Sequence, residues 1–361
     1  MVATPLFKVG VVPGDGIGPE VTAEALKVLS AAGEEFGFRA DIRRYDFGAE
    51  RYLKTSETLP EEALEEFRGH DAILMGAFGD PRVPDMRHAA DILLGVRFRL
   101  DLYVNQRPVR CLSDRLCPLK GRGREEIDFV VFRENTEGLY AGLGGNFKKG
   151  TPDEIALQED VNTRKGVERI VRHAFAFALR RAERRGRPPK VMMTDKSNAL
   201  RYGHDLWQRV FRQVAAEHPG IESGHLYVDA MAMQMLKDPS QFDVVVTCNM
   251  FGDILTDLGA ALQGGLGMAA SGNINPSGVS MFEPVHGSAP KYAGKDVANP
   301  MGAILTIQMM LEHLGHLDAA RAIEGAVASA LEMRQCTADV GGSLGTRATG
   351  DAVAGLLRRP A

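Results

Sequence analysis

Two aspartates lie four residues apart in the segment NMFGDILTDLG, residues 249–259. On a helix, Asp253 and Asp257 would project from one face, where two like charges repel unless a cation lies between them. Carboxylate oxygens are the ligands that Mg²⁺ and Mn²⁺ prefer, and Asp229 in YVDAMAMQM lies at the end of another predicted strand and could complete the set. A structural alternative stays open, in which Asp253 stabilises a helix N-terminus and Asp257 is simply solvated.

Three arginines stand near the ends of candidate elements. Arg97 lies in LLGVRFRLD, Arg107 in NQRPVR and Arg133 in VVFRENTEG. A guanidinium matches a carboxylate through two parallel hydrogen bonds, so three converging arginines would suit a di-acid substrate. Any one of them, taken alone, is better explained as a surface arginine.

A lysine and a tyrosine are candidates for proton transfer. Lys196 in TDKSNAL follows a predicted strand, and a lysine whose pKa is lowered in a cleft can act as a general base. Tyr140 in ENTEGLYAG could donate a proton or could simply pack in a hairpin. The segment EPVHGSAPKYAGKDVANP, residues 283–300, could hold phosphate and adenine groups through backbone amides and His286, or could be an ordinary turn-rich loop.

The elements that must position these residues alternate between short apolar runs and longer segments of helical period, which predicts an α/β fold. Polar residues follow most of the apolar runs, at the strand ends where open α/β sheets place their chemistry. The segment 142–150 predicts a hairpin or arm, and the glycine-rich segment 264–278 predicts a long functional loop. We expect strands at 7–12, 38–47, 71–79, 127–134, 189–196, 225–230 and 242–250, and helices at 19–37, 61–70 and 302–315.

Composition narrows the class of protein. The chain has 361 residues, a net charge of -4 and 25% charged residues, without the basic excess that nucleic-acid binding needs. No apolar run approaches the roughly 18 residues of a membrane span, and the early Asp15 and Glu20 do not suit a signal peptide. The four cysteines show no C-x-x-C spacing. We therefore expect a cytoplasmic protein that binds a small molecule and neither nucleic acid nor membrane.

Taken together, the motifs resemble those of the β-decarboxylating dehydrogenases, the family of the isocitrate, 3-isopropylmalate, homoisocitrate and tartrate/D-malate enzymes. They run in order along the whole chain: PGDGIGPE, RENTEGLY, DKSN, VDAMAM, FGDILTDLG and EPVHGSAP. The resemblance implies a homodimer of two-domain α/β subunits without a Rossmann fold. The large, discontinuous domain would comprise residues 1–104 and 260–361, and the small domain residues 105–259, with a dimer-clasping arm at about 136–160.

The resemblance also implies a role for each candidate residue. The metal, Mg²⁺ or Mn²⁺, would be held by Asp253, Asp257 and the neighbouring subunit's Asp229. Lys196, also from the neighbour, would accept the substrate's hydroxyl proton, and Tyr140 would return a proton to carbon. The substrate would be bound by Leu93, Leu94, Arg97, Arg107, Arg133 and Asn198. The NAD or NADP cofactor would be bound by Ile17, Glu283, His286, Gly287, Ser288, Ala289, Pro290, Lys291, Tyr292 and Asn299.

The choice of substrate and the choice of cofactor within the family depend on few residues. Leu93 and Leu94 match the pair that meets the isopropyl group of 3-isopropylmalate, an intermediate of leucine biosynthesis, whereas Asp91 would repel the third carboxylate of isocitrate. The wording RENTEGLYAGLGG keeps D-malate or tartrate as the alternative substrate. Lys291 and Tyr292 match the pair that binds the 2′-phosphate of NADP, but the rest of that signature is missing, so both cofactors stay open.

The glycine turn at residues 9–21, VGVVPGDGIGPEV, is a further candidate for cofactor binding. Its spacing is G-x-G-x-G rather than the Rossmann G-x-G-x-x-G. The acidic candidate Asp46 also lies further along than the usual distance of about 20 residues. We expect the turn to lie beside the dinucleotide, its glycines allowing backbone and ligand to approach closely.

Overall fold

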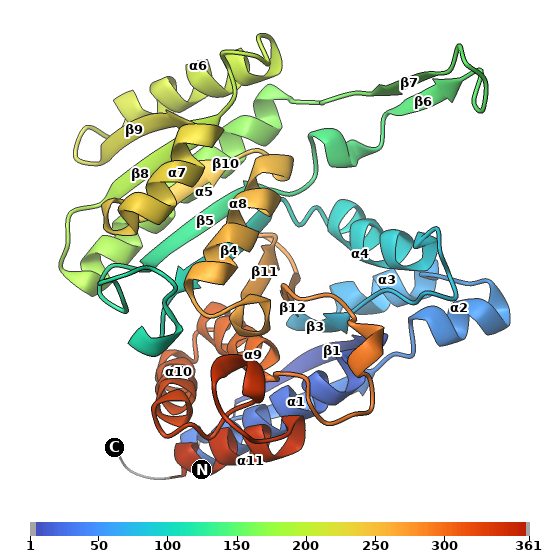
Figure 1. Cartoon of the computed structure of the whole chain (residues 1–361), viewed down its shortest axis with the longest axis vertical. Helices are drawn as coiled ribbons and strands as arrows, with labels where there is room; N and C mark the ends of the chain where they lie inside the picture. The colour runs from blue at the N-terminus through green and yellow to red at the C-terminus, as the bar shows by residue number, and fades with distance from the viewer. Residues whose placement is uncertain (1–4, 359–361) are drawn as a thin grey trace. The chain divides into compact units, whose positions relative to one another are not determined.

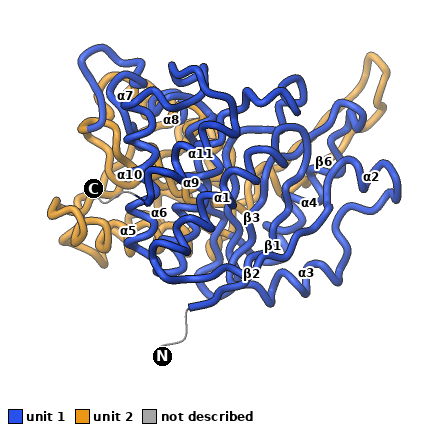
Figure 2. The backbone as a smooth tube through the Cα atoms, turned by 90° about the horizontal axis from the view of Figure 1, so that it is seen from below, with its two compact units in different colours: residues 1–102, 110–124, 260–361 blue, residues 103–109, 125–259 orange. Residues whose placement is uncertain are grey.

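The computed structural model describes residues 5–358, which divide into two compact units (Figure 2). Unit 1 comprises Met1–Leu102, Arg110–Arg124 and Ala260–Ala361, and unit 2 comprises Tyr103–Val109 and Glu125–Gly259. Residues 110–124, which we expected in the small domain, therefore cluster with the discontinuous unit.

Unit 1 contains a five-stranded part of the sheet in the order β2-β1-β3-β12-β11. Its strands are β1 (Leu6–Gly14), β2 (Arg39–Arg44), β3 (Ala72–Ala77), β11 (Ala270–Ile274) and β12 (Ser280–Pro284). The pairings among β2, β1, β3 and β12 are parallel, and β11 pairs antiparallel to β12. Its helices are α1 (Gly18–Phe36), α2 (Ala49–Thr55), α3 (Glu61–Arg68), α4 (Arg87–Arg99), α9 (Met301–His313), α10 (Leu317–Glu332) and α11 (Thr346–Leu357).

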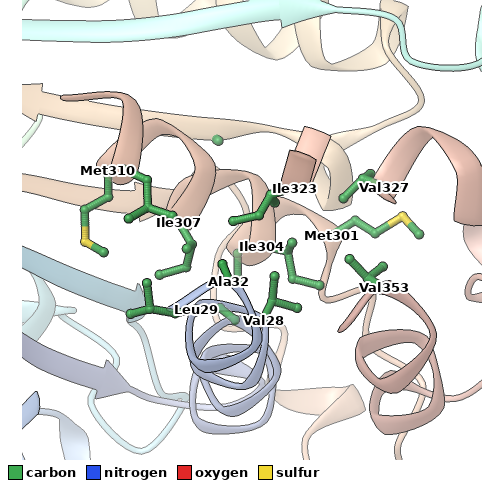
Figure 3. Packing of buried hydrophobic residues seen from close by; sticks show 14 of the residues in the cluster. Val28, Leu29, Ala32, Met301, Ile304, Ile307, Met310, Ile323, Val327 and Val353 are labelled. Atoms are coloured by element: carbon green, nitrogen blue, oxygen red, sulfur yellow. The ribbon is translucent and has the colours of Figure 1, made fainter. Parts of the chain in front are cut away.

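Alternation along the strands builds two hydrophobic cores in unit 1. Val9, Val11 and Leu74 face one side and join the core that α1 shares with α9, α10 and α11. Figure 3 shows side chains that these helices contribute to this core, such as Val28 and Ile304. Val12 and Met75 face the other side and pack with buried residues of α3 and α4. Each fully buried Val, Leu or Ile contributes about 1.5–3 kcal/mol. This burial makes the sheet a rigid platform for the loops at its carboxyl edge.

One sequence prediction for unit 1 is wrong. The segment 264–278 is not a long loop, because it contains the turn Leu266–Met268 and strand β11. All five β11 residues, ASGNI, are buried although three are Ser, Gly and Asn. A strand so poor in apolar residues has no alternating pattern to reveal it.

Unit 2 contains the strand order β4-β5-β10-β8-β9. The pairs β5–β10, β10–β8 and β8–β9 are parallel. The strands are β4 (Val104–Arg110), β5 (Asp128–Glu134), β8 (Lys190–Asp195), β9 (Glu222–Tyr227) and β10 (Val244–Thr247). The helices are α5 (Arg164–Arg185), α6 (Gly203–Ala216), α7 (Val228–Lys237) and α8 (Asn249–Leu262).

A two-stranded hairpin extends from unit 2 (Figure 1). Its strands β6 (Gly144–Phe147) and β7 (Ile155–Gln158) pair antiparallel, as the sequence predicted for this segment. Every residue of both strands is exposed, including the large apolar side chains of Phe147, Ile155 and Leu157.

The glycine turn lies between β1 and α1. Gly14 and Gly16 have positive φ angles, and a Cβ on either would overlap a backbone oxygen, that of Ala77 or Ser288 respectively. The amide of Ile17 donates to the Ser288 oxygen at 2.8 Å. The glycines thus let the turn pack directly on two other loops of the protein, a role that sequence reasoning assigned to contact with a ligand.

Candidate active site

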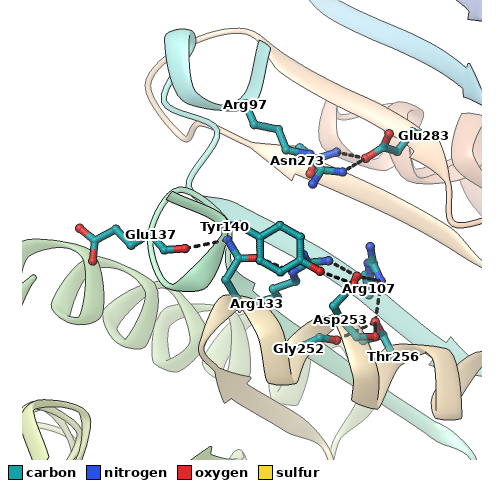
Figure 4. A network of polar contacts seen from close by, with 11 residues as sticks. Arg97, Arg107, Arg133, Glu137, Tyr140, Gly252, Asp253, Thr256, Asn273 and Glu283 are labelled. Atoms are coloured by element: carbon teal, nitrogen blue, oxygen red, sulfur yellow. Dashed lines mark hydrogen bonds and ion pairs between the residues drawn. The ribbon is translucent and has the colours of Figure 1, made fainter. Parts of the chain in front are cut away.

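The Asp253 cluster, defined as Arg107, Arg133, Tyr140 and Asp253, brings three charged side chains and a tyrosine together in unit 2 (Figure 4). Asp253 Oδ1 accepts a hydrogen bond from Arg133 Nη1 and lies 3.3 Å from Arg107 Nη1. Tyr140 Oη donates to Asp253 Oδ2 at 2.7 Å. Four candidates that lie far apart in the sequence are therefore in direct contact.

Local structure accounts for the position of Asp253. Helix α8 begins two residues after β10 ends, so Asp253 and Asp257 lie one turn apart on its surface, as the spacing predicted. The helix replaces the last residues of the strand that we expected over 242–250. Gly252 lets the helix approach β5, because a Cβ there would overlap the side chain of Arg133.

Two further residues of α8 hold the arginines, and sequence reasoning missed both. Asn249 Oδ1 accepts from Arg133 Nε at 2.8 Å, and Thr256 Oγ1 accepts from Arg107 Nη1 at 2.7 Å. They stand four residues before and three residues after Asp253, on the same helix face. That spacing is the signal that could have found them.

The carboxylates of Asp253 and Asp257 are candidate ligands for a divalent cation. Burial, and then repulsion by Asp253, raises the pKa of Asp257. The side chain of Asp257 forms no hydrogen bond or ion pair with any residue between 5 and 358. Two carboxylates at this spacing are a suitable donor set for Mg²⁺ or Mn²⁺, which would relieve their repulsion. No third His, Cys, Asp or Glu of the described chain joins them.

Lys196 and Asp229 form a separate pair in unit 2. Lys196 Nζ lies 2.9 Å from Asp229 Oδ1, and this hydrogen bond lowers the pKa of the aspartate. Asp229 lies in the first turn of α7, not at a strand end as predicted, because β9 stops at Tyr227. Asn198 is exposed in the turn after Lys196.

In unit 1, Arg97 is paired with a carboxylate. Arg97 Nη2 donates to Glu283 Oε1 at 2.6 Å, and the same oxygen accepts from Asn273 Nδ2 at 2.8 Å (Figure 4). All three side chains are buried. Glu283, expected beside the cofactor, thus orients Arg97. Leu93 and Leu94 are half-buried on the same helix, α4.

The segment after β12 carries the remaining cofactor candidates. His286 Nε2 is buried and forms no hydrogen bond within the described chain, and burial lowers the pKa of this imidazole. Ser288 and Asn299 are buried, whereas Gly287, Pro290, Lys291 and Tyr292 are exposed and Ala289 is half-buried with φ 39°. An unbonded buried nitrogen beside an exposed glycine fits a nucleotide-binding segment.

Comparisons with known proteins agree on one family. Residues 8–353 match the family described as isocitrate/isopropylmalate dehydrogenase. The chain belongs to this family. Its relatives include the 3-isopropylmalate dehydrogenases of Thermobifida fusca, 53% identical with 96% of each chain covered, and Frankia casuarinae, 50% identical over 95% of this chain and 100% of the relative.

Solved structures carry the same fold. Isocitrate dehydrogenase from Methylococcus capsulatus superposes with a TM-score of 0.87 at 38% identity, covering 98% of this chain and 100% of that one. The TT0538 protein from Thermus thermophilus gives a TM-score of 0.84 at 40% identity, covering 98% of this chain and 68% of that one.

The family and the α/β fold class predicted from the motifs are confirmed. The chain is therefore a dehydrogenase of a family that uses a divalent metal ion and an NAD-type cofactor. No helix of residues 5–358 has the length and apolarity to cross a membrane.

Proposed function

We propose that the chain catalyses the NAD-linked oxidative decarboxylation of 3-isopropylmalate, a step of leucine biosynthesis. The observation that carries the chemistry is the Asp253 cluster, where two buried guanidiniums lie beside the Asp253 carboxylate, with Asp257 one turn further along α8. The substrate assignment is supported by relatives of that name at 46–53% identity and by the apolar pair Leu93 and Leu94. The segment RENTEGLYAGLGG favours D-malate or tartrate as the second candidate.

The residues of the cluster would bind and orient the substrate. Arg107 and Arg133 would bind its carboxylates, since each is a buried cation whose partner Asp253 it shares with the other. Tyr140 keeps its proton at neutral pH, because burial and the hydrogen bond to Asp253 raise its pKa. It can therefore donate a proton to the substrate carbon after CO₂ has left.

The metal and cofactor would be held by residues that fit them. Asp253 and Asp257 would hold Mg²⁺ or Mn²⁺, and the segment from His286 to Asn299 would hold NAD or NADP with weak discrimination. When bound, these groups would supply Lewis-acid polarisation of the substrate oxygen and a hydride acceptor. Lys196 would accept the hydroxyl proton, and its hydrogen bond to Asp229 would orient the amine.

We further propose a homodimer in which Lys196 and Asp229 serve the partner's site. Exposed apolar side chains on the hairpin and on α7 and α8 support an interface there: Phe147, Ile155, Leu157, Met233, Leu236 and Ile254. Light scattering after size-exclusion chromatography should give twice the chain mass. The four unpaired cysteines are compatible with the reducing cytoplasm that we propose as its location.

The decisive experiment measures kcat/KM for 3-isopropylmalate, D-malate, tartrate and isocitrate with each cofactor, with Mg²⁺ and with EDTA. We expect 3-isopropylmalate to exceed D-malate about 30-fold, because burying the isopropyl group contributes about 2 kcal/mol. A higher kcat/KM for D-malate would contradict the substrate assignment and leave the reaction type standing. Turnover in EDTA would contradict the reaction type.

A further inference from the structure

A buried carboxylate in the glycine turn binds the starts of three neighbouring segments of unit 1. Asp15 Oδ1 accepts from the amide of Ala49 at 2.7 Å, at the first residue of α2. Asp15 Oδ2 accepts from the amide of Gly79 at 2.9 Å and lies 2.8 Å from His88 Nε2. Because a carboxylate only accepts, the proton of this last bond is carried by the imidazole.

His88 attaches helix α4 to the turn. It is the second residue of α4 and is fully buried, with its ring stacked against Tyr52 at 5.9 Å. The N-cap residue of α4, Met86, makes no side-chain cap and has φ 55°, and the preceding Asp85 accepts through Oδ1 from the amide of Arg87 at 3.2 Å. The bond from His88 to Asp15 adds to this local contact an anchor from a residue 73 positions away in the sequence.

The consequences of this anchor extend along α4. The helix carries Leu93, Leu94 and Arg97, five to nine residues beyond His88. A rigid helix transmits a displacement of its first turn to these side chains, and a shift of about 1 Å at a binding group can cost a large factor in rate.

We propose that Asp15 and His88 are positioning residues for substrate selection: together they fix the start of α4 and thereby the place of Leu93, Leu94 and Arg97. This inference rests on the proposed function, in which Leu93 and Leu94 meet the substrate, while Arg97 of the same helix stays paired with Glu283. Neither Asp15 nor His88 touches the substrate in this scheme. Their effect should therefore depend on whether the substrate carries the group that α4 contacts.

The test compares two variants of His88. His88→Phe keeps a ring against Tyr52 and removes the donor, while Asp15 Oδ2 retains its bond from Gly79. His88→Gln keeps a donor of similar reach. We expect H88F to lower kcat/KM for 3-isopropylmalate about tenfold and for D-malate less than threefold, with KM for NAD unchanged, and H88Q to recover most of the loss. His316→Phe, a ring exchange elsewhere in unit 1, should leave kcat/KM unchanged for both substrates.

A second measurement does not depend on the substrate. Hydrogen exchange of the α4 amides should become faster in H88F and stay unchanged in α9. Equal loss on both substrates, or unchanged exchange in α4, would overturn the positioning role. Failure of the wild-type enzyme to oxidise 3-isopropylmalate would instead contradict the proposed function, and the exchange result would still decide whether Asp15 and His88 anchor the helix.

Discussion

Each of the two units contains an ion pair between an arginine and a carboxylate. The two differ in the exposure of the carboxylate, which is buried in unit 1 and accessible in unit 2. In unit 1, Arg97 and Glu283 have side chains that are 10% and 8% exposed, paired one to one. In unit 2, the Arg133 side chain is 1% exposed, the Asp253 carboxylate is 36% exposed, and Arg107 shares that carboxylate. Both members of the first pair are buried, whereas in the second one accessible carboxylate lies beside two guanidiniums.

This difference separates a positioning contact from a binding site. A buried pair that is hydrogen-bonded on both sides can hardly exchange partners, since desolvated charges are costly to leave unpaired. Asp253 is accessible, so its carboxylate can bind a metal cation instead of the arginines. Both guanidiniums could then bind substrate carboxylates. We therefore expect changes in the Asp253 cluster to lower activity and changes in the Arg97 pair to lower stability.

The largest effect is expected for Asp253→Asn. The amide keeps the volume and an acceptor for Arg133 but removes one anionic metal ligand, so Mg²⁺-dependent turnover should fall about 10³-fold. Steady-state rates and calorimetric titration with Mn²⁺ measure the loss. Asp205→Asn, which removes an exposed carboxylate paired with Arg209 on α6, is the matched control. Undiminished turnover in D253N would show that the cluster is not the metal site.

Glu283→Ala should lower the stability of unit 1. It leaves the buried Arg97 without its anion, which we expect to cost about 3 kcal/mol in the free energy of unfolding of unit 1, measured with urea. Glu324→Ala is the control, because its partner Arg110 is half-exposed and such pairs contribute less than about 1 kcal/mol. An equal cost for both variants would remove the contrast between a locked pair and an ordinary surface contact.

Tyr140→Phe tests whether the cluster also moves a proton. The variant keeps the ring over Arg133, where the guanidinium lies 5.0 Å from the ring centre, and loses only the hydroxyl. We expect kcat to fall about 10²-fold with KM unchanged, as for loss of a general acid. Tyr202→Phe, at a fully exposed tyrosine, should have no effect. A rise in KM alone would make Tyr140 a binding residue.

Local patterns predicted more of unit 2 than of unit 1. Asp253 and Asp257 share a helix face because their spacing is a property of the helix itself, and the motif around Lys196 likewise marks a strand end. The pair of Arg97 and Glu283 joins residues 186 positions apart, and Asp15 and His88 lie 73 apart. No spacing rule connects such residues, because only the register of β1, β3 and β12 brings them together. Strand β11 was missed for a related reason, since tertiary contacts bury its polar residues.

The smallest effect is expected at Lys291, an exposed cation with no carboxylate partner in the described chain. Its ammonium lies 4.7 Å from the ring centre of Tyr292, which is itself 43% exposed. Solvent screens a charge in this position, so a contact with the 2′-phosphate of NADP should contribute about 1 kcal/mol. Lys291→Ala should therefore lower the ratio of kcat/KM for NADP to that for NAD about fivefold, with turnover on NAD unchanged.

Lys295→Ala, which removes an exposed lysine four residues on, is the matched control. An unchanged ratio in K291A would show that exposed lysine does not distinguish the cofactors. A change of 100-fold or more would mean that Lys291 becomes as enclosed as the arginines of the Asp253 cluster when the nucleotide binds.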